Sequence, residues 1–95
     1  MAWIKNLNTF RDFLSLVIVH APNDFPKEDY LSEDEQLRLE SAFAELYGGL
    51  RFLPVDRPVP RLRSLLDEAL GAYRSGDDVR GAHVLQSFET EAFDA

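Results

Sequence analysis

Apolar side chains recur at helical spacing in four separate stretches of this chain. In the first stretch they alternate in steps of four and three, the spacing of one helix face, and they are Trp3, Leu7, Phe10, Leu14, Val17 and Ala21. The third stretch fits the helical template without a gap, through Leu62, Leu65, Leu66, Ala69, Leu70 and Tyr73. Four helices are therefore predicted, at about 3–20, 33–47, 60–75 and 78–93.

Local signals mark the ends of the predicted helices. Ser32 and Glu35 have the spacing of a capping box, in which each side chain bonds the backbone N–H of the other residue, so they are expected to begin the second helix. Gly48–Gly49 is expected to end that helix in the left-handed conformation that glycine adopts readily. Gly76 is expected to end the third helix, and Asp77 to cap the fourth.

Two segments lack helical periodicity. Residues 22–31 contain two prolines and predict a long loop after the first helix, whereas 51–60 contains three and predicts a stiff connection between the second and third helices. The short connection at 75–78 predicts an antiparallel hairpin. The sequence thus predicts an all-α, compact, single-domain four-helix bundle over residues 1–95, packed around Leu14, Val17, Phe43, Leu46, Leu66, Leu70, Leu85 and Phe88.

Two local alternatives stay open. The β-branched run Val17–Ile18–Val19 is compatible with a buried strand over 13–19, although a helix is the preferred interpretation. Gly81, inside the fourth helix, either permits the close approach of a neighbouring helix or lies in a frayed first turn. The frayed turn is the preferred interpretation of the two.

Composition narrows the class of protein. The chain has 95 residues, no cysteine, 28% charged residues and a net charge of −7. Lack of cysteine excludes disulfides and thiolate chemistry and fits a cytoplasmic location. The negative charge disfavours nucleic acid and anionic membranes as partners. The apolar run at 13–19 is too short to span a membrane, and Asp12 before it and Pro22 after it argue against a secretion signal.

Motifs for catalysis or metal binding are weak. His20 and His83 are far apart in the sequence and have no metal-ligand spacing. Residues 24–35 have the length of a calcium loop, but Asp29 stands where that loop needs glycine and Pro26 where it needs an oxygen ligand. No phosphate-binding loop or nucleophile elbow is found. We therefore expect no enzyme activity, no cofactor and no metal site.

Charge is unevenly distributed along the chain. Residues 24–45 hold eight acidic residues against Lys27 and Arg38, a net charge of −6, while residues 51–63 hold four arginines against Asp56. One interpretation is a solvated helix face whose carboxylates pair with these arginines inside the monomer, which is the commoner role of charge runs on helices. The other is a binding surface for a basic partner, in which aromatic side chains anchor and carboxylates orient the encounter.

The binding interpretation gives the leading functional hypothesis. It is a small acidic protein-binding module, and within that class we favour an immunity-like or antitoxin-like inhibitor that covers the positively charged substrate cleft of a basic protein. The residues predicted to bind this partner are Asp24, Phe25, Glu28, Asp29, Tyr30, Glu33 and Asp34.

Two other functional classes are kept as alternatives. The first is a self-associating structural module, a homodimer in which exposed residues such as Trp3, Phe52 or Phe93 seal a two-fold interface. The second is a small-ligand binder or enzyme that uses a pocket between helices. Its predicted lining is Tyr47, Tyr73 and His83.

Overall fold

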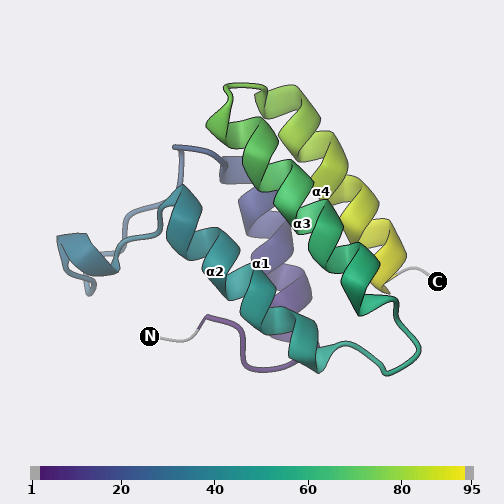
Figure 1. The fold of residues 1–95 in the computed structure, drawn as a ribbon. Coiled ribbons are helices and arrows are strands. Elements are labelled where there is room, and N and C mark those ends of the chain that lie inside the picture. The colour runs from purple at the N-terminus through teal and green to yellow at the C-terminus, as the bar shows by residue number, and fades with distance from the viewer. Residues whose placement is uncertain (1–2, 94–95) are drawn as a thin grey trace.

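The computed structural model describes residues 3–93, and every regular element within that range is helical (Figure 1). The four α-helices are α1 (Leu7–His20), α2 (Leu39–Gly49), α3 (Val59–Arg74) and α4 (Asp78–Phe93). Two short 3₁₀ turns, η1 (Glu33–Glu35) and η2 (Leu50–Phe52), lie beside α2 in sequence. The predicted all-α architecture is confirmed, and the strand alternative for 13–19 is wrong because those residues lie within α1.

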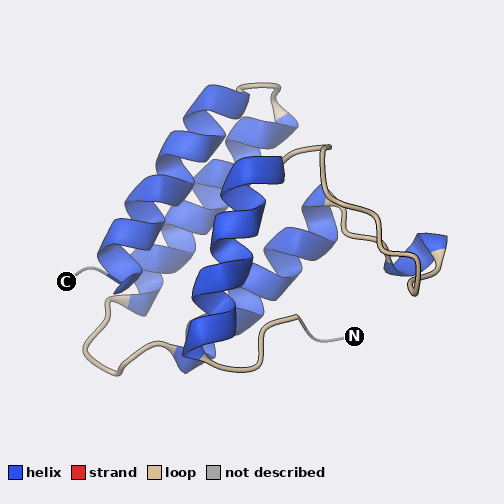
Figure 2. Cartoon of the chain, turned by 180° about the vertical axis from the view of Figure 1, so that it is seen from behind, coloured by secondary structure: helices blue, strands red, loops and turns tan. Residues whose placement is uncertain are grey.

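The helices form a closed ring of neighbours. Helix α1 contacts α2, α2 contacts α3, and α4 packs extensively on α3 and returns to contact α1 (Figures 1 and 2). The α3–α4 hairpin turns at Gly76, whose φ of 88° is the left-handed value that favours glycine. The Asp77 carboxylate then accepts a hydrogen bond from the backbone N–H of Arg80 at 3.2 Å. Both predicted hairpin signals are confirmed.

The core is a single apolar cluster between the four helices. Its largest fully buried side chains are Phe10, Leu14, Val17, Phe43, Leu46, Leu62, Leu66, Leu85 and Phe88. Among the predicted core residues only Leu70 is not fully enclosed, and it packs against the cluster from the outer edge of α3. The helical periodicity therefore identified the core correctly.

Two glycines lie where helices meet closely. A Cβ atom on Gly81 would be 2.7 Å from Cζ of Tyr73, so glycine lets the ring of α3 lie directly against the α4 backbone. Gly81 is buried, and the preferred frayed-turn interpretation is wrong. Similarly, a Cβ on Gly49 would be 2.9 Å from the Phe10 ring. The expected left-handed end at Gly48–Gly49 is also wrong, because α2 continues through Gly49 into η2.

The first helix begins later than its apolar pattern predicts. Asn6 and Thr9 form a capping box that starts α1 at Leu7, with Thr9 N–H donating to Asn6 Oδ1 at 2.9 Å. Residues 3–6 are irregular. Glu45 of α2 holds them, because its Oε1 accepts from the backbone N–H of Trp3 at 2.7 Å. Trp3 is therefore not in the helix, although its ring packs beside that of Phe13 with ring centres 5.9 Å apart.

Candidate functional site

Residues 22–38 leave the bundle between α1 and α2 as a protruding loop, which we call the acidic arm. Figure 1 shows it projecting from the side of the bundle with η1 at its outer end, and Figure 2 shows the same projection from behind. The arm carries six of the 17 acidic residues of the chain against Lys27 and Arg38, a net charge of −4. It contains all seven residues predicted to bind a partner.

The arm replaces the predicted first part of the second helix. Half of the predicted Ser32–Glu35 capping box forms, since Ser32 N–H donates to Glu35 Oε1 at 3.1 Å while Glu35 N–H donates to the Ser32 carbonyl oxygen at 3.0 Å, and it caps only η1. The chain is extended again at Gln36, and α2 begins at Leu39, where Arg38 N–H donates to Ser41 Oγ at 2.9 Å. The predicted helix at 33–47 is therefore wrong over its first six residues.

The side chain of Gln36 joins the two limbs of the arm. Its Nε2 donates to the carbonyl oxygens of Glu28 at 2.9 Å and Leu31 at 3.0 Å, and its Oε1 accepts from Glu28 N–H at 2.9 Å. Arg38 adds a bond from Nη2 to the Glu33 carbonyl at 3.2 Å. Sequence reasoning missed Gln36, because nothing in the local pattern shows that its amide would meet a backbone eight residues earlier.

Two aromatic side chains of the arm have different surroundings. Tyr30 is 69% exposed near the outer end. Phe25 is half-buried at the base and packs against the core cluster, so it anchors the arm rather than presenting a free ring. Among the predicted carboxylates, that of Glu28 belongs to a half-buried residue. The exposed predicted residues are Asp24, Asp29, Tyr30, Glu33 and Asp34.

The carboxylates of the arm have no ion pair within residues 3–93. The surface ion pairs found there are Arg61–Glu91 at 2.9 Å, Arg74–Glu40 at 3.8 Å and Arg80–Glu68 at 3.5 Å. Hydrogen bonds from the backbone and hydroxyl of Ser32 lower the pKa of Glu35. Because its pKa lies below the usual range, Glu35 keeps its negative charge in mildly acidic solution.

Residues 51–63, which hold four arginines, follow the end of α2 that is opposite the arm (Figure 1). Arg51 lies 4.8 Å from the centre of the Phe52 ring, Arg63 lies 5.6 Å from that of Tyr47, and Arg61 pairs with α4. The expected pairing between these arginines and the acidic stretch is thus not formed in the described part of the chain. Positive and negative regions are separated along α2.

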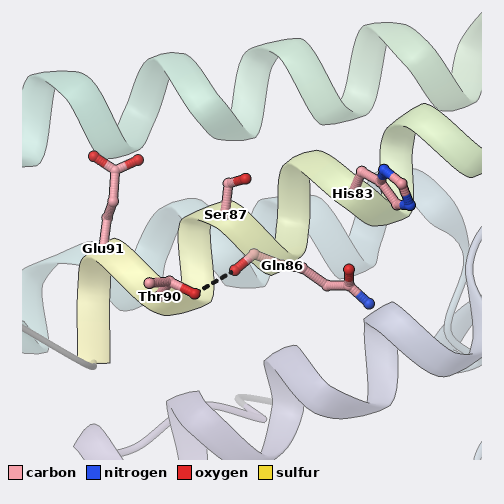
Figure 3. Close-up of a pocket in the computed structure, with 5 residues that line it drawn as sticks. All are labelled: His83, Gln86, Ser87, Thr90 and Glu91. Atoms are coloured by element: carbon pink, nitrogen blue, oxygen red, sulfur yellow. Dashed lines mark hydrogen bonds between the residues drawn. The ribbon is translucent and has the colours of Figure 1, made fainter.

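The pocket of the ligand-binding alternative is not assembled. His83 lies in a shallow hollow along α4 with Gln86, Ser87, Thr90 and Glu91, and Figure 3 shows these side chains pointing in different directions. Neither Tyr47 nor Tyr73 lines it. The Tyr47 hydroxyl donates to Asp67, and burial followed by this hydrogen bond raises the pKa of Tyr47 to about 12. Tyr73 is buried between Phe43 and Gly81.

The residues proposed to seal a homodimer are not freely exposed. Trp3, Phe52 and Phe93 are each half-buried and pack against the core cluster. Phe93, for example, meets Phe10 edge-on with ring centres 5.5 Å apart. These residues complete the monomer, and the expectation of an exposed aromatic face is wrong for all three.

The described residues contain neither a metal-binding cluster nor a membrane-spanning helix. Within residues 3–93, no group of three or more His, Cys, Asp or Glu side chains is placed to hold a metal ion. None of the helices in that range combines the length and the apolar run needed to cross a bilayer. Comparison with protein-family models, with curated proteins and with solved structures yields no match.

Proposed function

We propose that this protein binds a basic protein partner through the acidic arm, as an immunity-like or antitoxin-like inhibitor would. The observation that supports this most strongly is Tyr30. An aromatic side chain that is 69% exposed projects from a loop whose carboxylates have no ion pair within the described residues. Tyrosine is among the residues that contribute most to protein interfaces, because it buries a large ring with little loss of side-chain freedom.

The shape of the arm suits this role. A projecting loop enters a concave surface that the flat side of a helical bundle cannot reach, and a substrate cleft of a nucleic-acid enzyme is concave and positively charged. The exposed carboxylates of the arm would compete there with phosphate groups. Electrostatic attraction would speed the encounter and set its orientation, and Tyr30 would supply the anchoring contact.

The proposal is tested with a charge variant of the arm and a matched control. The arm variant carries amides at Asp24, Glu28, Asp29, Glu33 and Asp34. The control carries the same number of amides elsewhere, at Asp12, Asp56, Glu68, Asp78 and Glu89, so its net charge is identical. All three proteins are immobilised at low salt, and the retained proteins from a lysate of the source cell are identified by mass spectrometry.

The expected result is a basic protein that the intact chain and the control retain in stoichiometric amount and the arm variant does not. With that protein purified, titration calorimetry should show affinity that falls as salt rises, and Tyr30→Ala should weaken binding by about tenfold or more. Equal retention by the arm variant would refute the arm as the binding surface. If nothing is retained and intact and variant proteins sediment as the same concentration-dependent dimer, the self-associating module replaces this proposal.

A further inference from the structure

The base of the acidic arm forms one side of a cleft of about 440 Å³. The arm contributes Phe25 and Leu37, α2 contributes Leu39 and Glu40, and the last turn of α3 contributes Arg74. Figure 1 shows why these segments meet, since the two ends of the arm and the end of α3 lie on the same side of the bundle. The volume falls within the range of small-molecule sites, about 300–1,000 Å³.

The charged groups of this cleft favour an anion. Arg38 and Arg74 line it together with one carboxylate, that of Glu40. Arg74 Nε lies 3.8 Å from Glu40 Oε1, which is beyond hydrogen-bond distance, so the donors of Arg74 are not committed to that partner. Arg38 uses Nη2 on the Glu33 carbonyl, and a guanidinium has five N–H donors in all. Two arginines and one glutamate therefore line the cleft, which leaves an excess of positive charge among its charged side chains.

The backbone adds donors at the same place. Leu39 and Glu40 are the first residues of α2, where backbone N–H groups have no acceptor within the helix. No described residue outside the helix accepts from them either. The positive end of the α2 dipole thus lies at the cleft, and a helix start beside two arginines attracts a carboxylate or another small anion.

The apolar walls specify the rest of the ligand. Leu37 is buried, and Phe25 and Leu39 are half-buried, so the walls combine an aromatic ring with two leucine side chains. An apolar body of modest size would cover them, whereas a bare inorganic anion would leave them in water. We propose that this cleft binds a small amphipathic anion, a carboxylate carried on an apolar chain, with the head group at Arg38 and Arg74.

The first test compares three probes by amide NMR. Octanoate has both the charge and the apolar chain, acetate has only the charge, and octanamide has only the chain. Octanoate should produce saturable amide shifts at residues 23–25, 37–40 and 74, and neither acetate nor octanamide should saturate over the same concentration range. Shifts that do not saturate, that lie elsewhere, or that octanamide reproduces would overturn the proposal. Because this reads out on the intact protein, it is independent of whether any variant folds.

Substitutions test the head-group contact in both directions. Arg74→Gln should weaken octanoate binding by about fivefold or more, because a charge-assisted contact is lost. Arg80→Gln is the matched control, since Arg80 is similarly exposed and faces the single carboxylate of Glu68; it should change the affinity by less than about twofold. Glu40→Gln removes the competing carboxylate and should strengthen binding. Equal affinities for the Arg74 and Arg80 variants, or weaker binding by the Glu40 variant, would contradict the assignment.

Discussion

The α3–α4 hairpin and the acidic arm are held together by different forces. Across the hairpin, Leu62, Leu66, Leu85 and Phe88 are completely removed from solvent. Within residues 22–38, Leu37 is the only buried residue, and the limbs are joined mainly by hydrogen bonds to the Gln36 amide. Buried apolar area dominates stability, while partly exposed hydrogen bonds add little. Stability is therefore concentrated in the hairpin and its neighbours, and the proposed binding surface is placed on a region that contributes little to it.

Truncating one aromatic side chain in each region should give the largest difference. Phe88→Ala removes a fully buried ring that lies 6.0 Å from the ring of Phe10, and it should lower the free energy of unfolding by about 3–5 kcal/mol. Tyr30→Ala on the arm should change it by less than about 0.5 kcal/mol. Urea unfolding followed by circular dichroism measures both. Similar losses for the two variants would show that the arm and the bundle unfold as one tightly coupled unit.

Glycine substitutions test how closely the hairpin is packed. Alanine normally stabilises a helix interior by about 1 kcal/mol over glycine. At Gly81 we expect the opposite sign, a loss of about 1–3 kcal/mol, because the new Cβ would lie 2.7 Å from the Tyr73 ring. Gly71→Ala is the control in α3, where a Cβ meets no atom within 4 Å beyond the backbone of its own helix, and it should stabilise. Thermal unfolding of the two variants should move in opposite directions; stabilisation by both would mean that the ring yields freely.

The Asp77 cap of α4 is an exposed polar contact, so its effect on stability can be compared directly with that of the hydrogen bonds in the arm. Asp77→Ala removes the carboxylate that caps α4 through Arg80 N–H, and it should cost about 1 kcal/mol. Asp77→Asn keeps the accepting oxygen and should lose much less. Chemical unfolding of both variants separates the cap from the negative charge. If the asparagine variant loses as much as the alanine variant, attraction between the charge and the helix dipole is the larger effect.

The difference between the hairpin and the arm also explains which parts of the fold can be predicted from the sequence. The α3–α4 hairpin, with its glycine turn and its cap, follows from local patterns, because periodic apolar residues and end signals act over a few positions. The arm does not, because the Ser32–Glu35 capping box is equally compatible with a long helix and with one 3₁₀ turn. The choice is made by Gln36 and by the Arg38–Ser41 hydrogen bond at the start of α2, and the contacts of Gln36 depend on where the earlier limb of the arm lies.

The sequence indicates which residues belong to the candidate site but not how their side chains are arranged in space. Charge counting identified the acidic segment, and Tyr30, one of the two aromatic residues predicted to bind there, is exposed. Phe25 was assigned to the same surface, although its ring packs against the core cluster. No local pattern distinguishes these two rings, since each stands among carboxylates. The Arg38–Arg74 cleft was missed altogether, because its arginines are far apart in the sequence and meet only when α3 ends beside the arm.

Gln36→Ala should have the smallest effect on global stability. It is also the sharpest test of whether the arm and the α3–α4 hairpin are stabilised separately. The variant removes three hydrogen bonds between the limbs of the arm, and the freed backbone groups can turn to water because the arm is largely exposed. The free energy of unfolding should fall by less than about 0.5 kcal/mol. Gln86→Ala, on the exposed face of α4, is the matched control.

Hydrogen exchange resolves the effect that global unfolding does not. Glu28 N–H, which donates to Gln36 Oε1, and Leu31 N–H, which donates to the Glu28 carbonyl, should exchange faster in the Gln36 variant. Amides of α3 and α4 should keep their protection, because they are released only by opening of the bundle. If the helices lose protection together with the arm, the Gln36 contacts support the whole fold, and the arm is not an independently mobile surface.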